Sequence, residues 1–149
     1  MQGMTLIVKQ VTKLVTGFIF LFAFYLILFG HLSPGGGFVG GVALACGFIL
    51  LVLSYGKEHI NNLIRDRNMV VWDCIGALAF LFIALAGYFG GIFFENIWVD
   101  HGKNYNLLSG GTIPLANIAI GIKVGACLAG VFVALIVFHR DLDSAKGEE

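Results

Sequence analysis

The sequence predicts an all-α integral membrane protein with four transmembrane helices and both termini in the cytoplasm. Of its 149 residues, 58% are hydrophobic and only 12% are charged, whereas about a quarter of the residues in a typical soluble domain are charged. The mean hydropathy is +0.92. Four separate stretches are long and apolar enough to cross a bilayer. Composition therefore predicts a single transmembrane domain over residues 1–149.

Each expected span is a nearly continuous apolar run. The first two cover about residues 11–30 and 38–55, the third about 70–94 and the fourth about 113–138. Because lipid offers the backbone no hydrogen-bond partners, runs of this length must be helical. A β-barrel would need alternating segments of about ten residues, and these runs do not alternate. Residues 139–149 predict a charged cytoplasmic tail, of which DLDSAKGEE, residues 141–149, is expected to be disordered.

The distribution of lysine and arginine predicts the orientation. Four spans put the N-terminus, the second loop and the C-terminus on one side of the membrane, and cytoplasmic segments carry an excess of these residues. The other side has only Lys103. The cationic residues on the first side are Lys9, Lys13, Lys57, Arg65, Arg67, Arg140 and Lys146. We therefore expect cytoplasmic termini and an outward first loop.

Composition also argues against several classes of function. The net charge is zero, so no basic surface for nucleic acid is present. Cys46, Cys74 and Cys127 each stand alone in an apolar run, without metal-ligand spacing, which predicts small packing residues and no metal site or cofactor. The spans contain no nucleophile–base pair and no pair of haem-ligating histidines, which disfavours an enzyme.

The stretch GHLSPGGGFVGG, residues 30–41, contains six of the 21 glycines. A phosphate-binding loop would need a following lysine or a preceding strand, and neither is present. Ser33 and Pro34 favour the end of a helix, because the residue before proline is pushed out of the α region. Gly35, Gly36 and Gly37 supply the backbone freedom for a turn. The stretch therefore predicts an outward turn between antiparallel helices.

Small residues also recur at helical spacing after this turn. The GxxxG-type pairs are Gly36/Gly40, Gly37/Gly41, Gly87/Gly91 and Gly121/Gly125. Such pairs leave a bare helix face that a neighbouring helix can approach closely. They predict a chain packed among many helices, with glycines that serve neighbouring subunits as well as this chain.

Lys123 is the most informative single residue. It lies about nine residues into the fourth span, roughly 13–14 Å deep at 1.5 Å per residue, close to the midplane. A lysine there usually faces a protein interior or a wet cavity and has a partner. Asp73 lies in the first turn of the third span, so a direct pair with Lys123 is not expected, and the partner is expected in another chain. Lys123 and Asp73 are candidates for an ion or proton path; a structural salt bridge to another helix or subunit is the alternative for Lys123.

His31 has two interpretations. It is either an interfacial histidine at a helix end, bonded to a carbonyl or water, or a titratable group at the outer mouth of a proton or cation path. Asn117 lies six residues before Lys123 and therefore points in a different direction on the helix.

The run GHLSPGGGFVGG, which follows FAFYLILF and leads into an apolar helix, resembles the MnhB family. These are the B-type small membrane subunits of multisubunit Mrp sodium/proton antiporters. The resemblance is strongest over about residues 12–55. The stretch IPLANIAIGIKVGACLAGVF looks like the branch found in Mrp-like modules of membrane-bound hydrogenases. The motif positions are His31, Pro34, Gly35, Gly36, Gly37, Phe38, Gly40 and Gly41.

The resemblance implies a non-catalytic subunit in a prokaryotic plasma membrane. Its partners would be lipid and other membrane subunits, and sodium ions and protons would be the transported species. One alternative is the same subunit in a redox-driven respiratory complex, where any redox catalysis would belong to partner subunits. Another is a small transporter built from identical copies.

Overall fold

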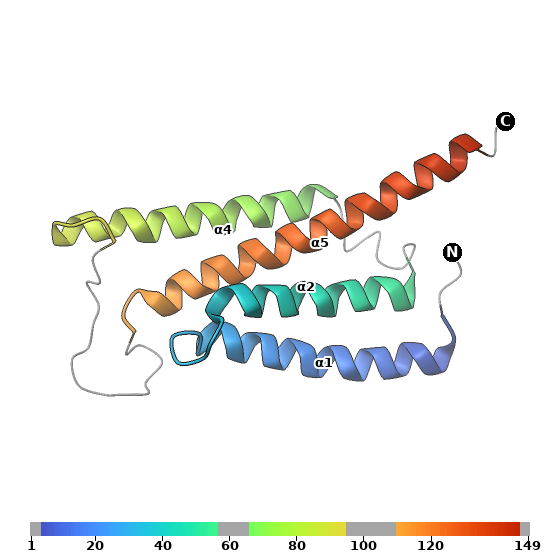
Figure 1. Cartoon of the computed structure of the whole chain (residues 1–149), viewed down its shortest axis with the longest axis horizontal. Helices are drawn as coiled ribbons and strands as arrows, with labels where there is room; N and C mark the ends of the chain where they lie inside the picture. Colours follow the sequence, from blue (N-terminus) through green and yellow to red (C-terminus); the bar gives the residue numbers. More distant parts are fainter. Residues whose placement is uncertain (1–3, 57–65, 95–109, 147–149) are drawn as a thin grey trace.

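The computed structural model describes residues 4–56, 66–94 and 110–146, and the side chains of these residues except 66, 67 and 139–146. Its helices are α1 (Leu6–Leu28), α2 (Gly36–Tyr55), α4 (Asp66–Ala86) with the short 3-10 helix η1 (Gly87–Gly90), and α5 (Ile113–Lys146). Four helical segments are long and apolar enough to cross a membrane, which confirms the predicted fold class. Helix α1 begins and α5 ends at the same end of the molecule (Figure 1). That this end is cytoplasmic stays a prediction.

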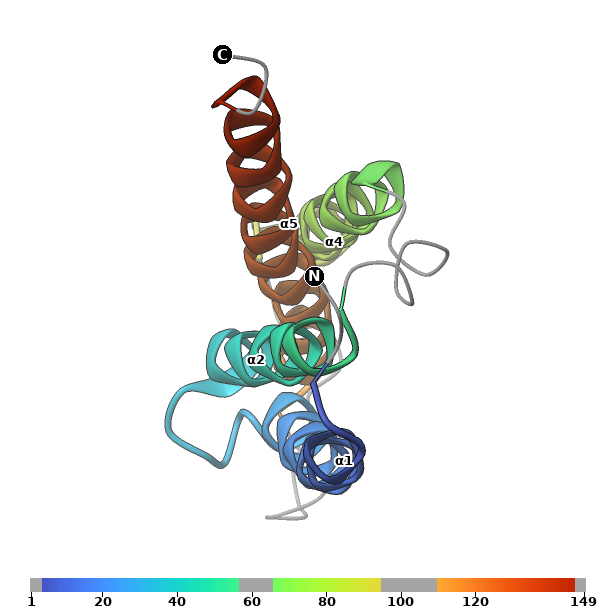
Figure 2. The ribbon, with the colours of Figure 1, turned by 90° about the vertical axis from the view of Figure 1, so that its right-hand side faces the viewer.

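The four helices form an open row rather than a closed bundle. Their spatial order is α1, α2, α5, α4, so that α2 packs on α1 and α5, and α5 packs on α2 and α4 (Figures 1 and 2). Within the described residues, α4 contacts neither α1 nor α2. Consequently only 11% of the apolar window in the Asn68–Gly90 span is buried. A row one helix thick leaves broad apolar faces on both sides.

Glycines set the distance between α2 and its two neighbours. A Cβ on Gly40 would lie 2.5 Å from Ile27 Cγ1 and 3.1 Å from the Ala23 carbonyl oxygen on α1. A Cβ on Gly41 would lie 2.8 Å from the Gly121 carbonyl oxygen on α5. These glycines therefore let backbone meet backbone inside this chain. Their bare faces are filled by α1 and α5, and are not open to other subunits.

The third span ends earlier than its hydropathy suggests. Helix α4 stops at Ala86, η1 follows, and Gly91 adopts φ 110°, a left-handed conformation that favours glycine. The chain then folds back, and the Phe94 N–H donates to the Ala84 carbonyl oxygen at 3.4 Å. Residues 91–94 therefore lie against the end of α4 instead of extending it.

The predicted disorder is wrong for residues 141–146, because α5 continues as a helix to Lys146. The sequence there contains no glycine or proline until Gly147, so nothing stops the helix earlier. The three cysteines, which are predicted to be small packing residues, do not pack in the interior of this chain. Cys46, Cys74 and Cys127 are all exposed, because an open row has little interior to hold them.

We expect Gly37→Ala to destabilise the chain by about 1–3 kcal/mol, the usual cost of overpacking. The added Cβ would lie 2.7 Å from Asn117 Cα and 2.8 Å from its carbonyl carbon, and backbone atoms cannot move aside. Gly17→Ala is the matched control, because that glycine has open space around it. Denaturant unfolding in detergent, followed by circular dichroism, measures both. Equal stability of the two variants would contradict the packing role of Gly37.

Candidate functional site

The turn between α1 and α2 is built on two glycines with positive φ. Gly35 has φ 106° and Gly36 has φ 53°, and α2 begins directly after Gly35. Before them, the N–H groups of Leu32 and Ser33 donate to the Phe29 carbonyl oxygen at 2.9 and 3.0 Å. Residues other than glycine rarely adopt these backbone φ values. The glycine run is therefore required by the backbone of the turn.

Asn117 of α5 caps the N-terminus of α2. The first N–H groups of a helix lack partners within it, and Gly35, the N-cap, has no side chain to offer. The Gly37 N–H instead donates to Asn117 Oδ1 at 3.3 Å. Gly30 makes room for the amide, since a Cβ there would lie 2.6 Å from Asn117 Nδ2. The turn is thus tied to the fourth span by a polar contact in an otherwise apolar setting.

The remaining candidate residues of the turn and of the helix-packing faces differ in how closely they are packed. Pro34 and Phe38 are exposed. A Cβ on Gly121 would lie 2.8 Å from Ile27 Cδ1, whereas one on Gly125 would be in ordinary contact with the Gly41 carbonyl oxygen at 3.4 Å. Gly121 is therefore tightly packed, and Gly125 is less so.

His31 is half-buried beside the start of α5. A Cβ on Gly110 would lie 3.4 Å from both Cβ and Cγ of His31. Lys123 is ten residues beyond Ile113, the first residue of α5. The structure therefore does not bring His31 together with Lys123.

Lys123 and Asp73 form an ion pair within the chain, contrary to expectation. Lys123 Nζ lies 2.7 Å from Asp73 Oδ1. Gly76 is the reason: a Cβ there would lie 2.8 Å from the Lys123 backbone nitrogen and 3.0 Å from the Ala119 carbonyl oxygen, so the two helices touch at this level. Asp73 is one turn before Gly76 on the same side of α4. The long lysine side chain spans the remaining difference in depth.

The ion pair faces outward from the row. The side chain of Lys123 is 46% exposed and that of Asp73 is 33% exposed. Lys123 nevertheless lies close to the midpoint of the Ile113–Phe138 span. A charge exposed to hydrocarbon at that depth costs several kcal/mol, so the pair needs a cover that the described part of this chain does not supply.

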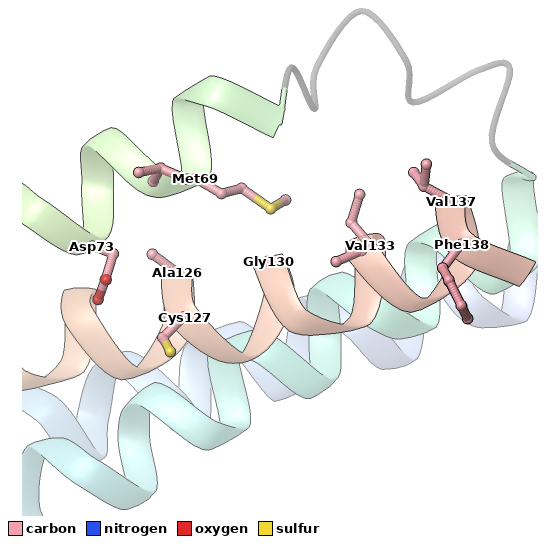
Figure 3. Close-up of a pocket in the computed structure, with 10 residues that line it drawn as sticks. Met69, Asp73, Ala126, Cys127, Gly130, Val133, Val137 and Phe138 are labelled. Atoms are coloured by element: carbon pink, nitrogen blue, oxygen red, sulfur yellow. The ribbon is translucent and has the colours of Figure 1, made fainter. Parts of the chain in front are cut away.

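A groove of about 530 Å³ runs along α4 and α5 from the ion pair. Met69, Val70 and Asp73 line it on α4, and residues between Ala126 and Phe138 line it on α5 (Figure 3). Asp73 lies at one end, and Val137 and Phe138 lie toward the other. The walls are mostly apolar, apart from Asp73 and Cys127.

Four spans in one open row, joined by a capped glycine turn and carrying a charged pair near mid-membrane, define a small multi-pass membrane protein. Residues 7–137 match the family described as "Domain related to MnhB subunit of Na+/H+ antiporter". The chain belongs to this family, as its glycine motif suggested, and is a multi-pass protein of the plasma membrane.

Individual relatives support this assignment. The "Putative antiporter subunit mnhB2" of Staphylococcus saprophyticus is 32% identical over 137 residues, which cover 92% of this chain and 94% of that protein. A Na(+)/H(+) antiporter subunit of Bacillus subtilis is 48% identical over 100 residues, or 67% of this chain and 66% of that one. An uncharacterized Methanocaldococcus jannaschii protein is 36% identical, and the match spans 42% of its length.

The fold also matches a solved structure, that of the membrane-bound sulfane sulfur reductase, an archaeal respiratory membrane complex. The TM-score is 0.70 at 32% sequence identity, and the match covers 85% of this chain. It covers 56% of the matched chain, so the present chain spans about half of that one.

We expect Asn117→Ala to destabilise the chain by about 1–2 kcal/mol, because it leaves the buried Gly37 N–H without its acceptor. Asn68→Ala, the same change at an exposed position near the start of α4, is the control. Unfolding in detergent measures both, and hydrogen exchange at the Gly37 amide reports the cap directly. Unaltered exchange in Asn117→Ala would refute the capping role.

Proposed function

We propose that this chain is an integral membrane subunit of a multisubunit Mrp-type sodium/proton antiporter module. The match of residues 7–137 to the MnhB family carries the proposal. The Staphylococcus saprophyticus relative adds to it, because the similarity covers nearly the full length of both chains. In this proposal sodium ions and protons are the transported species.

The chain acts as a transport subunit, and any redox catalysis belongs to other subunits. The open row supports this division of labour. A helix layer with little interior needs lipid and neighbouring membrane subunits to cover its apolar faces. Among the described residues, Lys123 is a charged residue close to the midpoint of its span, and its partner is Asp73 near the start of the neighbouring span.

Lys123 and Asp73 are the candidates for a contribution to the ion path. Ionisable residues within a membrane are expensive and often mark such paths. A pair that is exposed on the subunit is accessible to a path formed with a neighbour. His31, at the other end of α5, is the candidate for a titratable group at the outer mouth.

A second host for the same subunit is a redox-driven respiratory complex. The specific observation in its favour is the TM-score of 0.70 with a respiratory membrane complex at 32% identity. Purifying the native complex and identifying its subunits separates the two hosts. Soluble partners that bind redox cofactors favour the respiratory host, and their absence favours the antiporter.

Deletion of this chain tests the proposed function directly. We expect everted vesicles with the whole complex to show sodium-dependent dissipation of a pH gradient, and vesicles without this chain to lose it. Restoring the chain from a plasmid should restore the activity. Full antiport in the deletion strain would overturn the proposal, and antiport by the purified chain alone in liposomes would favour a self-sufficient transporter.

We expect Lys123→Ala to reduce sodium/proton antiport by about tenfold or more, because it leaves the Asp73 carboxylate in the membrane without its counter-charge. Lys13→Ala is the control, because Lys13 is exposed and lies nearer the end of its span. The same vesicle assay measures both, and blotting checks assembly. Normal transport and assembly in Lys123→Ala would eliminate the assigned role.

A further inference from the structure

We propose that the groove between α4 and α5 is the docking site for a transmembrane helix of another subunit, which carries a hydrogen-bond acceptor at the depth of the Lys123–Asp73 pair. The inference rests on the proposed function, because it requires a multisubunit complex. Beyond that function, the inference specifies which face of this chain contacts the partner and which chemical group the partner contributes. We call this face, from Met69 to Asp73 on α4 and from Lys123 to Phe138 on α5, the docking face.

The ammonium group of Lys123 has hydrogen-bonding capacity that this chain does not use. An ammonium group has three N–H donors, and within the described residues that of Lys123 bonds only to Asp73. Its side chain is 46% exposed. Lipid tails cannot accept the remaining hydrogen bonds. An acceptor from outside the chain, such as a carboxylate, amide or backbone carbonyl, satisfies the ammonium at this depth.

The docking face also has a shape that a transmembrane helix can fill. The groove begins at Asp73 and continues along α5 past Ala126 and Gly130 (Figure 3). Ala126, Gly130 and Ala134 all line it and recur every fourth residue, so they share one side of α5. Small residues at this spacing admit a neighbouring helix at close range. The charge and the close-packing surface are thus adjacent parts of one face.

Other occupants fit these features less well. An acyl chain would fill the apolar groove but brings no acceptor to mid-membrane. A second copy of this chain would offer Asp73, whose charge Lys123 already holds. A column of water needs polar walls, whereas Met69, Val133 and Val137 make this groove mainly apolar. A helix with one polar side chain satisfies both requirements.

Photo-crosslinking in the intact complex tests the location. Benzoylphenylalanine replaces Phe138, which lines the groove, or Phe18 of α1 as a control of the same residue type and similar exposure, 64% against 65%. We expect position 138 to crosslink to one other membrane subunit, with at least fivefold lower yield to that subunit from position 18. Equal yields, adducts with lipid alone or adducts with a second copy would overturn the proposal.

A double variant tests the chemistry. In Lys123→Met/Asp73→Leu both charges are gone, and a pair that satisfied only itself could be replaced in this way without loss. A partner acceptor that depends on Lys123 would instead be left unpaired. We therefore expect about tenfold less co-purification of the partner subunit, as loss of a bond to a charged group predicts. Undiminished co-purification would refute the acceptor.

Two controls keep the outcomes separate. Circular dichroism of the double variant must match the parent chain, so that reduced co-purification reports the interface and not misfolding; if the fold is lost, the crosslinking result decides. A parent chain that co-purifies with no other membrane subunit would refute the proposed function itself. Co-purification of the parent chain without the expected crosslink at position 138 would refute only the docking face.

Discussion

The close approach of backbones at the glycines of α2 is the constraint on which the rest of the structure depends. In a bilayer, lipid is as apolar as a leucine side chain, so helices gain from meeting only when they pack closely or share polar contacts. Gly40 allows α1 to pack closely against α2, and Gly41 allows α5 to do the same. At Gly37 the approach is so close that Asn117 can cap α2. Without these contacts α5 would have no fixed position in the row.

The energetic consequence of the Lys123–Asp73 ion pair depends on whether water or lipid surrounds it. A lysine and an aspartate 2.7 Å apart and partly exposed would contribute little on the surface of a soluble protein, because water screens and competes with both charges. In hydrocarbon the same exposure is costly. The outward position of Lys123 therefore says less about the stability of this chain than about what surrounds it.

The sequence is sufficient for the four spans, the turn and the family, because span length and glycine spacing are local properties. It is insufficient for the pairing of Lys123 with Asp73, which depends on the register between two helices. The signal was Gly76, one turn after Asp73, where α4 rests directly on α5. The spacing of Asn117 predicts only its direction on the helix, although a lone amide in an apolar run signals a buried polar contact. The open row was not predictable from hydropathy, which does not say which helices are neighbours.

Asn117 and Lys123 lie on the same uninterrupted helix, α5, and contact different neighbouring helices. Asn117 accepts a hydrogen bond from the start of α2, and Lys123 forms an ion pair with Asp73 of α4. Among the described helices, α5 therefore connects α4 to the α1–α2 pair. Any rotation of α5 about its own axis large enough to separate Lys123 from Asp73 would also move Asn117 relative to the first turn of α2. The cap of the glycine turn and the ion pair therefore depend on the orientation of the same helix, although the two contacts share no residue.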